Sequence, residues 1–282
     1  MVDQIGGTPD PRSGIPDLTG IDIESLPDFQ GDPLSIYYEP METESWALTR
    51  CPFVVALGYF SGLQRVWNLP VLTRGTDVWM SLVPMEVESQ WIGIDNASGH
   101  TVICGLGMGW SAAMTAFHPL VERVTVVERD PEIIELNRRI GLFDRLPDGL
   151  GDKISVVEGD AFTWKPDAPV DLLMPDIWLE VVSDGRAGET RRMQENVGAK
   201  GVYFWGQELE LARHIVRDGK PITDATLAEQ AEKFQLPLIG LDTEDYAENT
   251  KTAVRQWMKG RWLEGTEVPD DLRSPADDME PS

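Results

Sequence analysis

A glycine-rich turn between an apolar strand and a helix constrains the fold of this chain more than any other feature. The turn is the segment Val102-Ile-Cys-Gly105-Leu-Gly107-Met-Gly109-Trp110, and a helix is expected after it over Ser111–Phe117. Glycine at such a turn lets the backbone bend sharply and approach a ligand without a clash with a Cβ atom. The start of the helix offers unpaired N–H groups and the positive end of the helix dipole. The turn is therefore a candidate binding site, although packing alone can also require glycine.

Strands alternate with helices around and beyond this turn. Strands are expected over Thr101–Cys104, Arg123–Val127, Ile154–Val157, Val170–Met174 and Gly201–Trp205. Helices are expected over Pro131–Ile140 and about Gly188–Val197, and then over about Glu208–Arg217, Asp224–Phe234 and Thr243–Trp262. Strands separated by helical segments favour a parallel sheet covered on both faces. We therefore predict an α/β fold, a doubly wound and mostly parallel sheet, in a domain that spans residues 99–263.

Residues 41–98 have a different pattern, which predicts a small N-terminal β-rich extension. Two strands are expected over Pro70–Arg74 and Asp77–Val83, joined by a turn at Gly75. Phe53–Leu63 is apolar enough to form a buried strand or a buried helix, and Met85–Ile94 has the apolar spacing of an amphipathic helix.

Both ends of the chain are acidic. The sequence contains 24 Lys and Arg against 48 Asp and Glu, which gives a formal net charge of −24. Residues 1–40 and 264–282 are rich in acids and prolines and show no periodicity, so we expect flexible acidic segments there. A strongly negative chain repels polyanions, so no nucleic-acid partner is expected.

Neither a secretion signal nor a membrane span is apparent from the sequence. The N-terminal residues lack the charged start and apolar run of a signal peptide. The most apolar stretch, Cys51–Leu63, is shorter than the roughly 20 residues that a bilayer requires. The two cysteines, Cys51 and Cys104, provide no disulfide framework. We therefore expect a cytoplasmic protein with no membrane partner.

Two carboxylates follow the second and third expected strands of the sheet. Glu128 lies at the end of the second strand, where a carboxylate can accept hydrogen bonds from both hydroxyls of a ribose. Asp160 lies just beyond the third strand, where it can accept from an adenine amino group. Because the carboxyl ends of parallel strands meet at one edge, these acids and the glycine turn together predict a site for a nucleotide-containing cofactor.

The region Thr101–Gln207 carries four segments that resemble a known family. They are Val-Ile-Cys-Gly-Leu-Gly-Met-Gly at 102–109, Val-Thr-Val-Val-Glu-Arg-Asp-Pro-Glu at 124–132, Ile-Ser-Val-Val-Glu-Gly-Asp-Ala-Phe at 154–162 and Val-Asp-Leu-Leu-Met-Pro-Asp at 170–176. In these segments the chain resembles class I S-adenosylmethionine (SAM)-dependent methyltransferases, and within them the spermidine-synthase-like branch. The resemblance implies a Rossmann-like methyltransferase fold with SAM as the cofactor.

The same resemblance implies a role for each cofactor-site residue. Gly105, Gly107 and Gly109 would pass under the methionine part of SAM. Glu128 would hold the ribose and Asp160 the adenine amine, while Arg129 and Ala161 would line the adenine face.

Three functions are consistent with these features. The leading hypothesis is a SAM-dependent methyltransferase that acts on a small-molecule acceptor. The first alternative is an aminopropyltransferase that uses decarboxylated SAM, but that family carries an aspartate in the glycine loop where this chain has Met108. The second alternative is a non-catalytic SAM-binding protein.

The candidate acceptor-side residues follow the first, fourth and fifth strands. Asp176, at the end of the fourth strand, is the candidate base or orienting acceptor. Aromatic faces can bind a cation or a flat substrate, so Trp110, Trp178 and Trp205 are candidate substrate contacts, and Gln207 offers an amide. The three histidines lack the spacing of metal ligands, so no metal site is predicted. The resemblance and the strands near residues 71–83 favour a homodimer.

Overall fold

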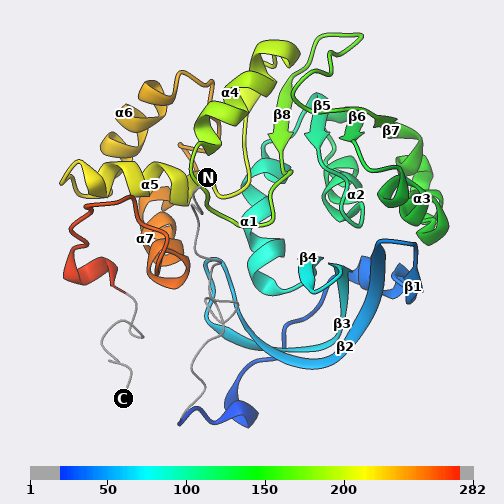
Figure 1. Ribbon diagram of the computed structural model, residues 1–282, viewed down its shortest axis with the longest axis horizontal. Helices are drawn as coiled ribbons and strands as arrows, with labels where there is room; N and C mark the ends of the chain where they lie inside the picture. The colour runs from blue at the N-terminus through cyan, green and yellow to red at the C-terminus, as the bar shows by residue number, and fades with distance from the viewer. Residues whose placement is uncertain (1–19, 274–282) are drawn as a thin grey trace, which may run out of the picture.

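The structure, a computed structural model, describes residues 20–273. It contains two sheets, one above the other (Figure 1). The upper sheet has five parallel strands: β5 Gly99–Cys104, β6 Val121–Glu128, β7 Ile154–Glu158, β8 Leu172–Pro175 and β9 Gly201–Val202. Their order is β7-β6-β5-β8-β9, so that the chain starts in the middle and winds outward on each side. This order confirms the predicted doubly wound α/β fold.

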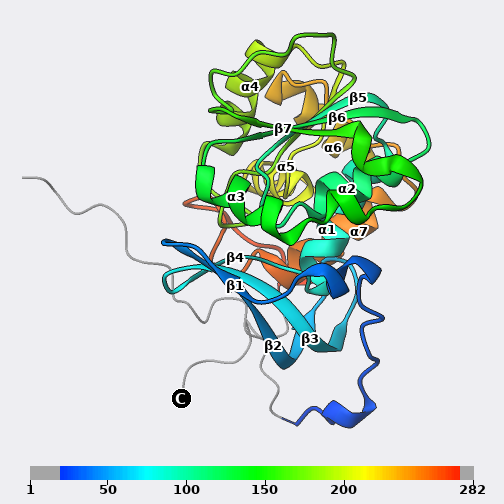
Figure 2. The same cartoon turned by 90° about the vertical axis from the view of Figure 1, so that its right-hand side faces the viewer.

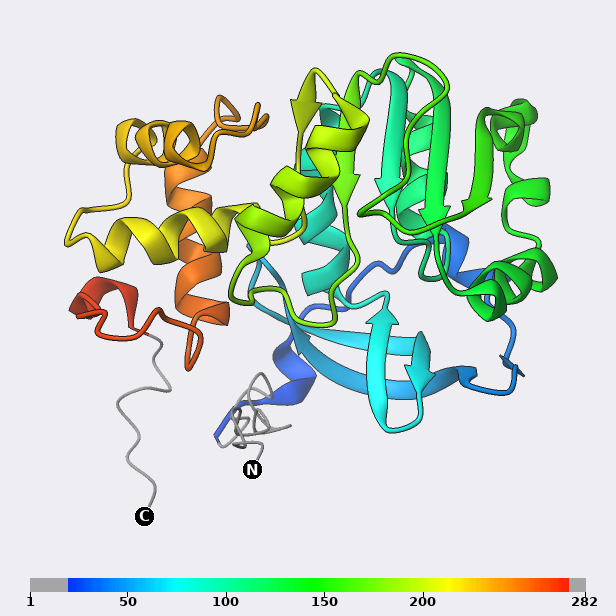
Figure 3. The ribbon, with the colours of Figure 1, turned by 45° about the horizontal axis from the view of Figure 1, so that its top comes forward.

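Helices flank the parallel sheet and extend beyond its β9 edge. They are α1 Pro84–Asp95, α2 Trp110–Phe117, α3 Pro131–Ile140, α4 Arg186–Val197, α5 Gln207–Arg217, α6 Asp224–Phe234 and α7 Tyr246–Trp257. The last three pack against one another at one end of the molecule, as Figure 3 shows. In the part of the chain that the structure describes, no helix combines the length and the apolar character needed to cross a membrane.

The lower sheet is an antiparallel meander that confirms the predicted N-terminal β-rich extension. Its strands are β1 Met41–Glu42, β2 Trp46–Leu57, β3 Leu63–Arg74 and β4 Asp77–Ser81, in that order. The segment 53–63, for which strand and helix are both open, contains the end of β2, the turn over 58–62 and the first residue of β3, so it is not a helix. The predicted turn at Gly75 joins β3 to β4, with a φ of 59° that suits glycine. Figure 2 shows this curved sheet beneath the helices and the parallel sheet.

The described part of the acidic N-terminal segment packs along this lower sheet. Residues 20–40 contain two short helices, Ile23–Ser25 and Pro33–Tyr37. Leu34 and Tyr38 are buried, and the backbone N–H of Phe29 donates to the carbonyl of Arg65 in β3 at 2.8 Å. A few apolar side chains among the acids thus anchor a segment that we expected to be flexible.

The described part of the acidic C-terminal segment is also anchored by an apolar side chain. Leu272, in the short helix Asp270–Leu272, is buried. The remainder of the two predicted acidic segments, residues 1–19 and 274–282, lies outside the described residues. The division of the chain at residues 40, 98 and 263 stays a prediction.

Helix α1 joins the two sheets and packs tightly against the parallel one. A Cβ atom on Gly93 of α1 would lie 2.5 Å from Tyr203 Cδ1 and 2.7 Å from Met174 Cε. Tyr203 has little freedom to yield, because its ring is buried and its hydroxyl donates to the carbonyl of Ser89 at 2.8 Å. Glycine at position 93 therefore sets how closely α1 approaches β8.

This close approach predicts opposite effects for two helical glycine substitutions. Gly93→Ala should lower the free energy of unfolding by about 1–3 kcal/mol, because overpacking outweighs the gain in helix propensity. Gly188→Ala in α4 is the matched control, since no atom lies within 4 Å of its added Cβ. It should raise the free energy of unfolding by about 0.5–1 kcal/mol. Urea denaturation measures both, and a stabilising Gly93→Ala would contradict the packing described.

Candidate functional site

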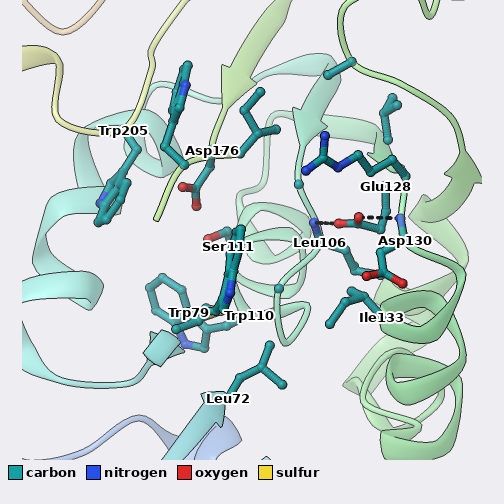
Figure 4. A pocket seen from close by; sticks show the side chains of 18 of the residues that line it. Leu72, Trp79, Leu106, Trp110, Ser111, Glu128, Asp130, Ile133, Asp176 and Trp205 are labelled. Carbon is teal, nitrogen blue, oxygen red and sulfur yellow. Dashed lines mark hydrogen bonds between the residues drawn. The ribbon is translucent and has the colours of Figure 1, made fainter. Parts of the chain in front are cut away.

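A pocket opens where the carboxyl ends of the parallel strands face the N-terminal sheet. Its walls come from β4 and α1 on one side and from the loops after β5, β6, β7 and β8 on the other. Figure 4 shows Asp176 and Trp205 at one end of this pocket and Glu128 and Asp130 at the other, with Leu106 of the glycine loop between them. The pocket thus extends across the switch point of the sheet, where open α/β folds bind their ligands.

The glycine loop forms the floor of the pocket, and its three glycines have different tasks. All three have positive φ, at 100° for Gly105, 49° for Gly107 and 78° for Gly109. A side chain on Gly105 would overlap the carbonyl oxygen of Asp176, and one on Gly107 would meet Met80 Sδ at 2.6 Å. These two glycines line the pocket.

Gly109, which the resemblance places under the cofactor, does not line the pocket. It caps the start of α2 in a left-handed conformation, and a Cβ there would meet Asn137 Oδ1 of α3 at 2.7 Å. Its role is therefore to let α2 begin close to α3.

Glu128 ties the glycine loop to the end of β6. Its Oε2 accepts a hydrogen bond from the backbone N–H of Leu106 at 2.9 Å, and its Oε1 accepts from that of Asp130 at 2.8 Å. An ionised carboxylate has about four lone-pair sites, so both oxygens keep acceptor capacity. Glu128 and its neighbour Arg129 both line the pocket.

Asp160 and Ala161 line the same end of the pocket, at the turn after β7. Asp160 Oδ1 accepts from the backbone N–H of Phe162 at 2.9 Å, which fixes the carboxylate at the turn. The structure thus brings together six of the seven residues predicted for the cofactor: Gly105, Gly107, Glu128, Arg129, Asp160 and Ala161.

Asp176 reaches the opposite end of the pocket from the carboxyl end of β8. Its Oδ2 accepts a hydrogen bond from Gln90 Nε2 of α1 at 2.8 Å. Burial raises the pKa of Asp176 to about 6, although the Arg186 charge and the Gln90 hydrogen bond oppose the rise. A carboxylate in this state is ionised at neutral pH and is still basic enough to accept a proton.

Glu86 is a second carboxyl group at this end of the pocket, and it is not among the residues predicted for the site. It belongs to the first turn of α1, and its two oxygens accept from the backbone N–H and the Oγ of Ser81, at 2.8 and 3.0 Å. Burial raises the pKa of Glu86 to about 8, and the charge of Asp176 adds to the rise. In the sequence it is marked only by its place two residues after Pro84, at the start of the expected helix, which many exposed helix residues share.

The predicted tryptophans Trp110, Trp178 and Trp205 all line the pocket, together with Trp46 and Trp79. Trp178 Nε1 donates to Glu189 at 2.6 Å, and Trp205 Nε1 donates to Ser89 Oγ at 2.8 Å, so both rings are fixed. The guanidinium of Arg186 lies 4.3 Å from the centre of the Trp178 ring. The walls are therefore rigid, flat and mostly apolar.

Gln207 does not reach the pocket, which corrects its prediction as a substrate contact. Its side chain is buried, and its Nε2 donates to the carbonyl of Ile239 at 2.9 Å and to the hydroxyl of Tyr246 at 3.2 Å. The left-handed turn at Gly206 starts α5 here and directs the amide into the contact with α7.

Met108 also lies outside the pocket, although aminopropyltransferases carry an aspartate at this place in the loop. Its side chain is buried in the core. Within residues 20–273, no group of three or more His, Cys, Asp or Glu residues could hold a metal ion.

Comparisons with known proteins add solved structures with a partly similar fold. A glycopeptide N-methyltransferase, MtfA, in complex with S-adenosyl-L-homocysteine (SAH), is 18% identical with a TM-score of 0.32, over 39% of this chain and 43% of that chain. A complex of DhpI with SAM and HEP is 23% identical with a TM-score of 0.32, over 42% of this chain and 52% of that one. The methyltransferase domain of bacterial CtHen1 is 16% identical with a TM-score of 0.34, over 42% and 65%.

The matched region spans less than two thirds of each of these structures. No protein-family model matches the chain, and no curated protein matches it. The fold is therefore assigned from the order and direction of the strands. The site is assigned from the geometry of the pocket.

Proposed function

We propose that this protein is a methyltransferase that takes a methyl group from SAM and transfers it to a small-molecule acceptor. One observation carries the proposal: a single pocket joins the glycine loop, Glu128, Asp160 and Asp176 at the carboxyl ends of four neighbouring parallel strands. This edge is where open α/β sheets bind nucleotide cofactors.

The residues that line the pocket match the hydrogen-bonding groups and the charge of SAM. Glu128 keeps lone pairs for the ribose hydroxyls, and Asp160 can accept from the adenine amine. Gly105 and Gly107 leave the floor free of side chains, and SAM, when bound, supplies an electrophilic methyl group on a sulfonium. Asp176 at the far end is ionised at neutral pH and makes that region negative, which favours a cationic centre there.

Asp176 is the residue suited to accept a proton from the acceptor. It faces the pocket, and Gln90 holds one of its oxygens while the other has no hydrogen bond in the described part of the chain. The surrounding tryptophans exclude water, which strengthens electrostatic interactions inside the pocket. Positioning and proton removal are the main tasks of an enzyme in such an in-line displacement.

Cofactor binding tests the function directly. Isothermal titration should show micromolar or tighter binding of SAM and SAH, and weaker binding of decarboxylated SAM and NAD. Asp160→Ala should weaken SAH about 10-fold, because a hydrogen bond to a charged group is lost. Asp152→Ala, an exposed acid that does not line the pocket, is the control and should leave the affinity unchanged. No binding of SAM or SAH would refute the proposal, and tighter binding of decarboxylated SAM would favour aminopropyl transfer.

The charge of Asp176 predicts a pH-dependent preference between SAM and SAH. SAM carries a sulfonium and SAH does not, so the ionised carboxylate stabilises SAM more strongly. As the pH rises through about 6, Asp176 loses its proton and the ratio of SAM to SAH affinity should rise several-fold.

Titrations of both ligands at pH 5 and pH 7 measure this ratio in the wild type and in Asp176→Asn. The variant should lose the increase while still binding SAH. An unchanged increase in Asp176→Asn would place the sulfonium away from Asp176.

A further inference from the structure

We propose that the acceptor is a monoamine, a single amine nitrogen on an apolar, flat body, with that nitrogen held between Asp176 and Glu86. This inference rests on the proposed methyltransferase function and names the substrate class of the same pocket.

This end of the pocket holds two buried carboxyl groups, Asp176 and Glu86. Neither Asp176 nor Glu86 forms an ion pair with a lysine or arginine in the described part of the chain. Asp176 is bonded to the neutral amide of Gln90, and Glu86 to the backbone and hydroxyl of Ser81. Two buried carboxyl groups without a cation ionise less readily, as their raised pKa values show, and a ligand that brings a positive charge would favour the ionised form of both.

Arg186 does not supply that charge. It attracts Asp176 from behind the pocket wall, but it does not line the pocket. Its two terminal nitrogens donate to the carbonyls of Glu180, Val181 and Trp205 and to Ser183 Oγ, while its Nε has no partner among the described residues. The guanidinium therefore anchors the loop after β8 and leaves the pocket side of Asp176 open.

Aromatic side chains form the wall of the pocket near the two acids. Trp79, Trp110 and Trp205 line this chamber, and indole faces attract ammonium groups. Trp110 is only 1% exposed, and its Nε1–H has no partner among the described residues. A buried donor without a partner is rare, and it is a second sign that a ligand completes this chamber.

The rest of the pocket wall limits the acceptor to one charged nitrogen. Besides the two acids, β3 contributes Leu72 and the cationic Arg74 to the wall, the segment before α1 contributes Leu82, and α1 contributes Val87. The remaining pocket acids are Glu128, Asp130 and Asp160. Figure 4 shows Glu128 and Asp130 at the end opposite Asp176, and Asp160 follows β7, the strand beside β6. A second ammonium on the acceptor would therefore meet apolar side chains without a carboxylate, which is unfavourable.

The chemistry balances with these residues. The bound ammonium gives one proton to Asp176, which leaves the nitrogen with a lone pair. The nitrogen forms a bond to the methyl carbon as the carbon–sulfur bond breaks, and the electron pair of that bond stays on sulfur. The product is an N-methylammonium whose positive charge faces Glu86, and Asp176 returns its proton to water.

Matched ligands test the substrate class in binding as well as in turnover. With the protein saturated with SAH, isothermal titration should show 2-phenylethylamine binding at least 10-fold more tightly than 2-phenylethanol, which has the same body without the charge. Putrescine, a diamine without an apolar body, should bind more weakly than 2-phenylethylamine. With radiolabelled SAM, label should pass to the amine and not to the alcohol.

Substitution of the acids assigns the effect to these residues. Glu86→Gln should weaken 2-phenylethylamine at least 10-fold and leave 2-phenylethanol and SAH unchanged. Glu122→Gln, an exposed acid on β6 away from the pocket, is the matched control and should change neither ligand. Asp176→Asn is the second variant if Glu86→Gln does not fold, and it should weaken the amine in the same way.

The outcomes separate this inference from the proposed function. If SAH binds but the alcohol or putrescine binds as well as the amine, or if the amine does not bind at millimolar concentration, the substrate class is wrong and the cofactor assignment stands. If Glu86→Gln weakens SAH and not the amine, Glu86 serves the cofactor and the inference is overturned. If neither SAM nor SAH binds, the proposed function fails first.

Discussion

The pocket depends on how closely the ends of two neighbouring parallel strands approach each other. The backbone N–H of Asp176, just after β8, donates to the carbonyl of Cys104 at the end of β5 at 2.8 Å. This bond places the next residue, Gly105, against the carbonyl of Asp176, where no side chain fits. One backbone contact therefore brings the glycine loop and the acid at position 176 to the same edge of the sheet, and the proposed chemistry follows from that proximity.

The N-terminal sheet turns this edge into an enclosed site. Met80 of β4 touches the glycine loop, since its sulfur accepts from the backbone N–H of Met108 at 3.2 Å. Ser81 of the same strand holds Glu86 in the pocket wall. Enclosure removes water from the two carboxylates, which is why the pKa values of Asp176 and Glu86 are raised to about 6 and about 8. An extension that looks peripheral in the sequence thus sets the electrostatics of the site.

The sequence was sufficient to predict the parallel sheet and to place most of the candidate cofactor residues at one edge of it, because these depend on local patterns. Strand–helix alternation has a distinct periodicity, and Glu128 and Asp160 directly follow apolar runs. What the sequence did not reveal depends on contacts between distant segments. Glu86 is indistinguishable from a solvated helix residue until Ser81 and the facing sheet enclose it.

Tertiary contacts also explain where the structure differs from what the sequence pattern suggests. Gln207 was assigned to the pocket from its place after the fifth strand, but the turn at Gly206 directs its amide toward α7. Gly109 was assigned to the cofactor from its place in the loop, but its freedom serves the contact of α2 with Asn137. In the acidic N-terminal segment, the average composition concealed the apolar anchors Leu34 and Tyr38.

A crystal structure of the protein with SAH tests the central claim most directly. We expect the adenine beside Asp160 and Ala161 and the ribose hydroxyls on Glu128. The sulfur should lie above the glycine loop and be directed toward Asp176. SAH bound at another place, or in this pocket with its adenine at the Asp176 end, would contradict this claim.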